Sequence, residues 1–277
     1  MSNLTFLDGA FGTRIWDKTG ESKPVWMYNI QRPDVIREVT EEYAAAGAQI
    51  IQANTFGANR IAVARSSDYS VEEVVAAAVR IAKEAVQGTD VKIGLSAGPL
   101  TEMMEPYGDL EEEEVAEIYD EMFRVGIREG ADLIQLETFM DVEMLRVAAE
   151  QAKTYGVPVL CTMSFEESGR TMFGNSVEDM AEVLGEVGVD GIGLNCSLGP
   201  DKAVPLMKKL AEATDLPLIC KPNAGVPVMD ADGNMTNPYT KEDFVREIAD
   251  AVPVLSYIGG CCGTDPSYIA LLKEKFQ

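Results

Sequence analysis

The chain contains no histidine. Histidine is the commonest general base and metal ligand in proteins, so proton transfer or metal binding here has to use other side chains. Basic residues are also scarce, with 23 lysines and arginines against 46 aspartates and glutamates and a net charge of −23. Nucleic acids and anionic membranes bind basic surfaces, and we therefore exclude both as partners. An acidic excess of this kind is typical of a solvated surface.

Long apolar runs are missing as well, since no stretch of 18 residues is apolar enough to span a membrane. The first residues, "MSNLTFLDGA", lack the basic start and the apolar core of a signal peptide. Only five cysteines are present, an odd number. We therefore expect a cytoplasmic protein whose cysteines are free thiols or metal ligands, and no disulfide framework.

What the chain does have is one alternating pattern of short β-rich apolar runs and amphipathic stretches such as "PDVIREVTEEYAAAG". The runs are Leu4–Leu7, Gln49–Phe56, Val91–Ala97, Leu133–Phe139, Val157–Phe165, Gly191–Ser197, Pro217–Lys221 and Val254–Gly259. Strands that alternate with helices indicate βαβ units and a parallel sheet. Eight units within 277 residues fit a (β/α)8 TIM barrel.

A doubly wound open sheet is the main alternative. The glycines of "DGAFGT", after the first run, lack the spacing of a dinucleotide-binding loop. No linker, low-complexity tract or internal repeat divides the chain. We therefore predict a single α/β barrel domain over residues 1–277, with its active site at the C-terminal ends of the strands.

Polar and small residues gather where those strands are expected to end, in "LDGAFGT", "ANTFGANR", "LETF", "LNCSLGP", "KPNAG" and "GGCCGT". Three of the five cysteines are among them, because Cys196 ends the sixth run and Cys261 and Cys262 follow the eighth. Three thiolates without histidine suit zinc, which binds soft ligands tetrahedrally. Three protein ligands leave a fourth position open, as in a catalytic site.

The adjacent pair leaves other interpretations open. Neighbouring cysteines form a disulfide only with strain, so Cys261 and Cys262 are packing residues, a redox pair or two ligands of one metal. Successive strand residues point to opposite faces, so both sulfurs reach one ion only if the chain turns there. Gly259, Gly260 and Gly263 supply the conformational freedom for that turn. The remaining two cysteines lie inside strands, and we expect small buried side chains there.

Three thiolates make zinc a weak Lewis acid for water, and they suit the binding of another thiol in its nucleophilic thiolate form. This predicts S-alkylation of a small thiol. Glu137 has no cation beside it in the sequence and is a candidate receptor for a substrate ammonium group. The "DGAFGT" turn offers backbone N–H groups to a carboxylate. The alternatives are that Asp8 only caps a turn and that Glu137 belongs to an ion pair of the barrel.

Six motifs, "DGAFGT", "QANTFGANR", "LETFMDVEML", "GLNCSLGP", "KPNAG" and "GGCCGT", together resemble the homocysteine S-methyltransferase family. The resemblance is to the homocysteine-binding barrel of cobalamin-dependent methionine synthase, and it runs in order over residues 8–264. It implies a (β/α)8 barrel with Zn²⁺ bound by Cys196, Cys261 and Cys262. It also implies that Asn223 fills the fourth zinc position until the substrate sulfur displaces it.

The same resemblance implies where homocysteine binds. Its amino group is expected near Glu137 and Asp8, and its carboxylate near the amides of Gly9 and Ala10. Asn54, in the second of the six motifs, completes the residues that we expect to contact the substrate.

The methyl donor is left open. Betaine-dependent relatives carry an aromatic residue directly after the fourth-strand glutamate, where this chain has Thr138. A "DxHxxG" corrinoid motif is impossible without histidine, so we expect either that a separate corrinoid protein supplies the methyl group or that this chain is a domain excised from a larger protein. We predict a zinc-dependent conversion of homocysteine to methionine, with a methylated corrinoid protein or a methyltetrahydrofolate-linked system as donor. The alternatives are an S-methylmethionine or other donor, a thiol-binding subunit without activity of its own, and a purely structural role of the cysteines.

Overall fold

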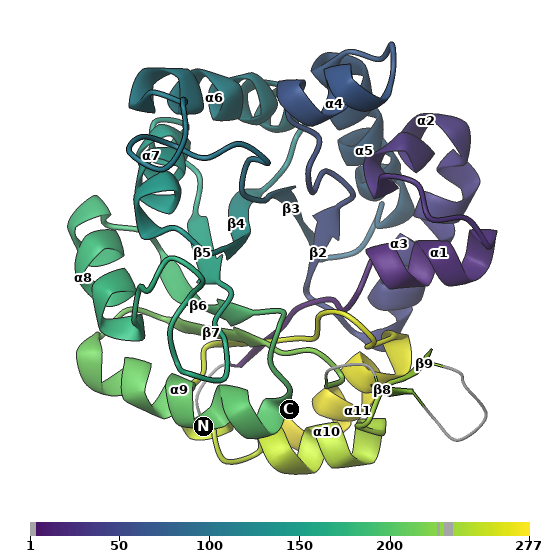
Figure 1. Cartoon of the computed structure of the whole chain (residues 1–277). Coiled ribbons are helices and arrows are strands. Elements are labelled where there is room, and N and C mark those ends of the chain that lie inside the picture. Colours follow the sequence, from purple (N-terminus) through teal and green to yellow (C-terminus); the bar gives the residue numbers. More distant parts are fainter. Residues whose placement is uncertain (1–3, 226–227, 230–234) are drawn as a thin grey trace.

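The computed structural model describes residues 4–225, 228–229 and 235–277. Eight parallel strands form a ring, and the helices surround it (Figure 1). The strands are β1 (Thr5–Phe6), β2 (Ile50–Ala53), β3 (Lys92–Ala97), β4 (Leu133–Phe139), β5 (Val159–Met163), β6 (Gly191–Asn195), β7 (Leu218–Lys221) and β10 (Tyr257–Ile258). They pair in the order β1-β10-β7-β6-β5-β4-β3-β2, and a parallel bridge between Leu7 and Ile50 joins the two ends of this order. The predicted (β/α)8 barrel is confirmed.

The helices begin with the signals expected from the sequence, such as the capping box between Ser70 and Glu73 and proline at the first position of α3. The α-helices are α1 (Gly12–Thr19), α2 (Tyr28–Gln31), α3 (Pro33–Ala46), α4 (Arg60–Ser66), α5 (Val71–Ala85), α6 (Glu112–Arg128), α7 (Val142–Lys153), α8 (Val177–Val187), α9 (Pro200–Ala213), α10 (Lys241–Ile248) and α11 (Pro266–Phe276). Two 3-10 helices, η1 (Val25–Met27) and η2 (Val252–Val254), and a hairpin of β8 (Val228–Met229) and β9 (Met235–Thr236) complete the described elements. No helix within the described residues is long and apolar enough to cross a membrane.

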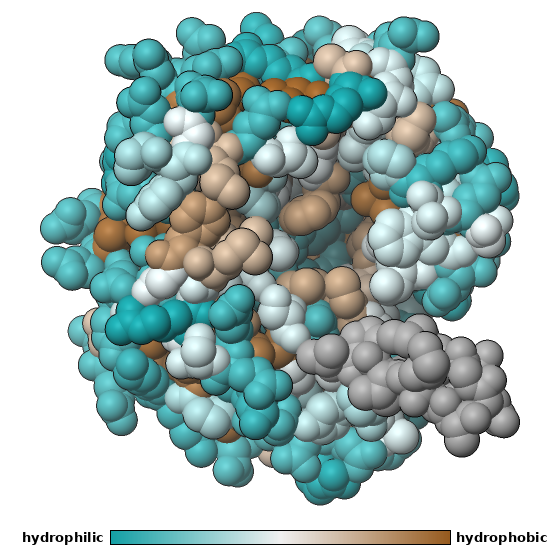
Figure 2. Space-filling view, in the orientation of Figure 1, coloured by the Kyte–Doolittle hydropathy of each residue, from teal (hydrophilic) through white to brown (hydrophobic). Residues whose placement is uncertain are grey.

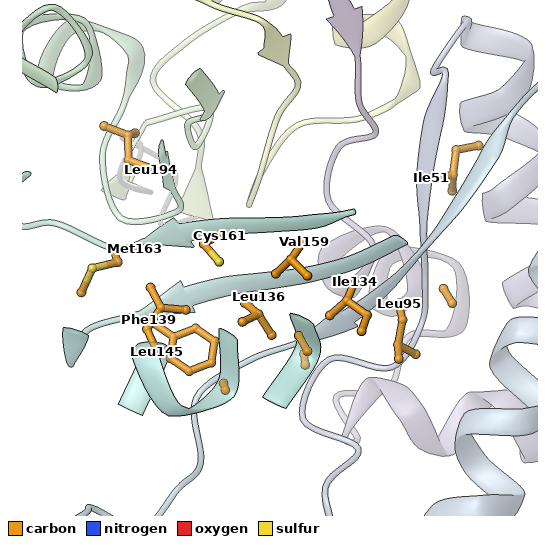
Figure 3. Close-up of a cluster of buried hydrophobic side chains, with 14 of the residues drawn as sticks. Ile51, Leu95, Ile134, Leu136, Phe139, Leu145, Val159, Cys161, Met163 and Leu194 are labelled. Atoms are coloured by element: carbon orange, nitrogen blue, oxygen red, sulfur yellow. The ribbon is translucent and has the colours of Figure 1, made fainter. Parts of the chain in front are cut away.

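The larger apolar core lies between the strands and the helices. Figure 3 shows one part of it, where Phe139 of β4 and Leu145 of α7 are both fully buried. Cys161 of β5 and Cys220 of β7 belong to the same layer, and burial raises the pKa of both thiols. These two cysteines are small buried side chains, as expected.

A second, smaller apolar cluster made up of Leu7, Ile50, Leu133, Leu160 and Ile219 is separate from the first. Strand residues alternate between the two faces of a sheet, so the positions two residues further along β2, β4, β5 and β7 share the face of this cluster. Those positions hold the buried polar residues Gln52, Gln135, Thr162 and Lys221. This face of the barrel therefore changes from apolar to polar toward the C-terminal ends of the strands.

Seven of the eight predicted strands are longer than the observed ones, and β4 has the predicted bounds. Two of the differences, at β6 and β10, have a clear structural cause. β6 ends at Asn195, because Cys196 and Ser197 have φ angles of 62° and 53°, in the left-handed region. The eighth run was expected to begin at Val254, but that residue lies in the proline-containing 3-10 helix η2 and β10 begins at Tyr257. Both differences shift residues near the strand ends from extended strand into turns.

Candidate functional site

A cavity of about 480 Å³ opens among the C-terminal ends of the strands. It corresponds to the hollow at the centre of Figure 2, inside the ring of helices. Loops after β1, β2, β6 and β10 contribute to its wall, and so do the C-terminal end of β4 and aromatic residues of α1 and η1. The predicted site residues that line it are Asp8, Gly9, Ala10, Asn54, Glu137, Cys196, Cys261 and Cys262. The expectation that polar strand ends meet at one face is therefore met.

The three rim cysteines meet at one point. The sulfur atoms of Cys196, Cys261 and Cys262 all lie within 4.8 Å of one another, and the Cys196 and Cys262 sulfurs are 3.8 Å apart. The Cys196 sulfur and burial of the site raise the pKa of the Cys261 thiol to about 12. In the absence of a cation these thiols are therefore protonated near neutral pH. A soft divalent ion would replace their protons.

The glycines around the cysteine pair serve two purposes. Gly263 has a φ of 79°, which turns the chain after Cys262. Gly259 and Gly260 do not have positive φ angles, although the sequence suggested that they supply the turn. A Cβ atom on Gly259 would lie 2.6 Å from the carbonyl oxygen of Asp8, and one on Gly260 would lie 2.4 Å from Oγ1 of Thr264. These two glycines are required for close packing.

Asn223 is fixed beside the cysteine pair by the backbone. The Cys261 N–H donates to the Pro222 carbonyl, and the Ala224 N–H donates to the Cys262 carbonyl, both at 2.9 Å. Asn223 lies between these two bonds, and its Oδ1 atom is buried without a hydrogen-bond partner among the described residues. Buried polar atoms are seldom left unsatisfied, so this oxygen is able to accept one further bond. Three thiols and one amide oxygen form a donor set that fits zinc.

The carboxylates of the site are paired with a lysine that the sequence analysis missed. Lys221 is buried at the end of β7, and its Nζ atom lies 2.7 Å from Oδ1 of Asp8 and 3.9 Å from Oε2 of Glu137. Glu137 has no cation beside it along the sequence, but the fold brings Lys221 near it, as in the alternative that Glu137 belongs to an ion pair of the barrel. The sequence does contain an indication of Lys221, because a cation on the inward-facing side of a buried strand needs an anionic partner.

The hydrogen bonds distinguish the two carboxylates. Asp8 uses Oδ1 for Lys221 and Oδ2 for the backbone N–H of Gln52, at 2.7 Å, so it does more than cap a turn. Glu137 accepts a hydrogen bond from Ser96 at Oε1, which leaves Oε2 as its freer atom. Burial raises the pKa of Glu137, and the charge of Lys221 opposes this effect. With all three groups ionised the cluster carries one negative charge, which one further cation would balance.

The other predicted substrate contacts, Gly9, Ala10 and Asn54, differ in the space around them and in the hydrogen bonds that they already make. A Cβ atom on Gly9 would lie 2.7 Å from Oγ1 of Thr264, so only glycine fits there. The Ala10 N–H already donates to the same oxygen at 3.3 Å, which makes it a weaker candidate for a carboxylate than the sequence suggested. The Nδ2 atom of Asn54 donates to the carbonyl of Val25 at 2.8 Å and so ties β2 to η1.

Comparison with known proteins identifies the family of the chain. The family model described as Homocysteine S-methyltransferase matches residues 5–276. Methionine synthase of Mycobacterium tuberculosis is 30% identical over 286 aligned residues, covering 95% of this chain and 24% of the relative. Methionine synthase of Mycobacterium leprae is 29% identical, covering 95% of this chain and 23% of the relative. The chain thus spans about a quarter of the length of these relatives.

Solved structures show the same fold. The metallated form of the homocysteine methyltransferase MmuM from Escherichia coli superposes with a TM-score of 0.81 at 23% identity, covering 99% of this chain and 96% of that one. Its apo form gives a TM-score of 0.74 at 21% identity over the same shares. The family match extends over nearly the whole chain and confirms the resemblance carried by the six sequence motifs. This chain is therefore a member of the homocysteine S-methyltransferase family of enzymes.

Proposed function

We propose that the chain methylates the thiol of homocysteine to give methionine, with a zinc ion held by Cys196, Cys261 and Cys262. One observation carries this proposal: three sulfur atoms within 4.8 Å of one another share a single cavity with the buried carboxylate Glu137. A substrate with a thiol at one end and an ammonium group at the other would match this arrangement. The matched family and the names of the relatives agree with it.

Zinc bound there would supply a Lewis acid that keeps the substrate thiol deprotonated at neutral pH. Oε2 of Glu137 would bind the substrate ammonium, while Lys221 and Gln52 keep Asp8 in place. The buried Oδ1 of Asn223 would complete the donor set when no substrate is present. In the reaction the bond between methyl group and donor breaks, a new S–CH3 bond forms, and the thiol proton leaves to solvent.

We propose a methylated corrinoid protein as the donor and residues 1–277 as one catalytic domain. The motif resemblance to the barrel of cobalamin-dependent methionine synthase supports this donor. Thr138 stands where betaine-dependent relatives carry an aromatic residue, which disfavours betaine.

The test is a methionine-forming assay with zinc-loaded protein, homocysteine and one donor at a time. The donors are a methylated corrinoid protein, methyltetrahydrofolate, S-methylmethionine and betaine. We expect methionine with the corrinoid donor. Methionine with S-methylmethionine alone would replace the proposed donor, and no methionine with any donor would contradict the proposed activity. Zinc-free protein is the control.

A further inference from the structure

Asn195 contacts both the cysteine pair and Thr138, the residue directly after Glu137. It is the last residue of β6, directly before Cys196, and only 1% of it is exposed. Its Oδ1 atom accepts hydrogen bonds from the Thr138 backbone N–H and from the Thr162 hydroxyl, both at 2.7 Å. Its Nδ2 atom donates to Oγ1 of Thr138 at 2.8 Å and lies 3.8 Å from the sulfur of Cys261. One side chain therefore joins the ends of β4, β5 and β6 to the cysteine pair.

The hydrogen bonds fix the orientation of the amide. The side-chain oxygen accepts from two groups, the Thr138 N–H and the Thr162 hydroxyl. The backbone N–H can only donate, so the oxygen has to face Thr138 and the NH2 group has to face Cys261. An N–H group directed at a thiolate withdraws negative charge from the sulfur, as groups around the ligands do in other metal sites.

The same amide stabilises an unusual backbone on the ammonium side. Thr138 has a φ of 66°, which costs a β-branched residue about 1–3 kcal/mol. It lies in the irregular part of β4 between Leu136 and Phe139, directly after Glu137. The two hydrogen bonds between Asn195 and Thr138 hold this conformation. They therefore set the direction in which the Glu137 side chain projects from β4.

We propose that Asn195 is a positioning residue that orients Glu137 through Thr138 and tunes the charge on the Cys261 sulfur. This proposal rests on the proposed function, because it assumes a metal ion at the cysteines and an ammonium group at Glu137. It assigns both specificity and metal affinity to one uncharged side chain that contacts neither the reacting atoms nor solvent.

The test compares two substitutions of Asn195. Asn195→Ala removes all its bonds, and we expect zinc affinity, measured by chelator competition, to fall about 10–100-fold. In the cobalt(II)-loaded protein the sulfur-to-metal charge-transfer band should move to longer wavelength, because the sulfur becomes richer in electrons. The preference for homocysteine over its deamino analogue, measured by titrating the cobalt form, should decrease. Asn195→Asp keeps the acceptor for Thr138 but loses the N–H donor. It should keep the amine preference and still show the shifted band.

Thr162→Val is the matched control. It removes one buried hydrogen bond to Asn195 but leaves the Thr138 and Cys261 contacts in place. It should lower the melting temperature without moving zinc affinity, the cobalt band or the amine preference.

The assignment would be overturned if a folded Asn195→Ala protein kept its zinc affinity, the position of the cobalt band and the preference for the amine. The unsubstituted protein separates this result from a failure of the proposed function. If it binds zinc and forms methionine while Asn195→Ala behaves identically, only the role of Asn195 is refuted. If the unsubstituted protein binds no zinc, both are refuted.

Discussion

The two halves of the candidate site are built in opposite ways. The sulfur half consists of Cys196, Cys261 and Cys262, which lie on turns beyond the strand ends with their sulfur atoms within 4.8 Å of one another. The charge half consists of Asp8, Glu137 and Lys221, which are buried and already paired. The proposed zinc ion would come to the sulfur half from solution, whereas the charge half already contains its own cation, Lys221, and keeps one unbalanced negative charge. Metal binding should depend on the first half, and folding stability mainly on the second.

Replacing the cysteine pair should have the largest effect. In a Cys261→Ser, Cys262→Ser protein we expect zinc binding and methionine formation to fall at least about 100-fold, because two of three soft ligands are lost. The free energy of unfolding of the zinc-free protein should change little. Metal analysis of the purified protein and urea unfolding measure the two quantities. If the double variant bound as much zinc as the unsubstituted protein, the cysteine pair would not be the metal site, and the contrast between the halves would be wrong.

Lys221→Met should lower the free energy of unfolding strongly and zinc affinity only slightly. It leaves the Asp8 carboxylate buried without its cation, and we expect the free energy of unfolding to fall by about 3–5 kcal/mol. Zinc affinity should change far less than stability. Urea unfolding with and without zinc tests this. The combined Asp8→Asn, Lys221→Met protein is the matched control, and it should recover part of the loss because the Asp8 charge is removed together with its cation, while Glu137 still loses the charge of Lys221.

Glu137→Gln separates substrate binding from stability within the charge half. The amide can still accept the hydrogen bond from Ser96, and the pair of Lys221 with Asp8 remains. Loss of the bond to a charged ammonium should weaken homocysteine binding about 10–100-fold, equivalent to about 1.5–3 kcal/mol. Zinc affinity should be unchanged. Titration of the cobalt form with homocysteine measures this, and tight binding by the variant would place the ammonium elsewhere.

The smallest effect concerns pH. Burial raises the pKa of Glu137 above its ordinary value of 4.5, so the folded protein binds this proton more tightly than the unfolded chain. Ionised Glu137 therefore costs stability at neutral pH, and that cost is relieved as the pH falls through the folded pKa toward 4.5. Relative to Glu137→Gln, the unsubstituted protein should gain stability between pH 7 and 4. Urea unfolding at several pH values tests the sign.

The contrast between the halves also explains what the sequence could predict. The eight strands and the three rim cysteines were identified because strand ends and unusual cysteine positions are local features of the sequence. Lys221 was missed because its partners Asp8 and Glu137 lie on distant strands, and only the closed barrel brings them together. Asn195 was missed because its role depends on the left-handed conformation of Thr138, which nothing in a threonine residue indicates.

The attachment of Asn223 to the cysteine pair has a practical consequence for protein engineering. The bonds from Cys261 to Pro222 and from Ala224 to Cys262 join main-chain atoms, so they do not depend on which side chains the two loops carry. Segments 221–225 and 259–264 can therefore be grafted together, as one unit, into another protein. Another (β/α)8 barrel with two adjacent strands of this register could receive them together, provided that it supplies a third thiol from the next strand and a first strand that packs as closely against Gly259 as Asp8 does here.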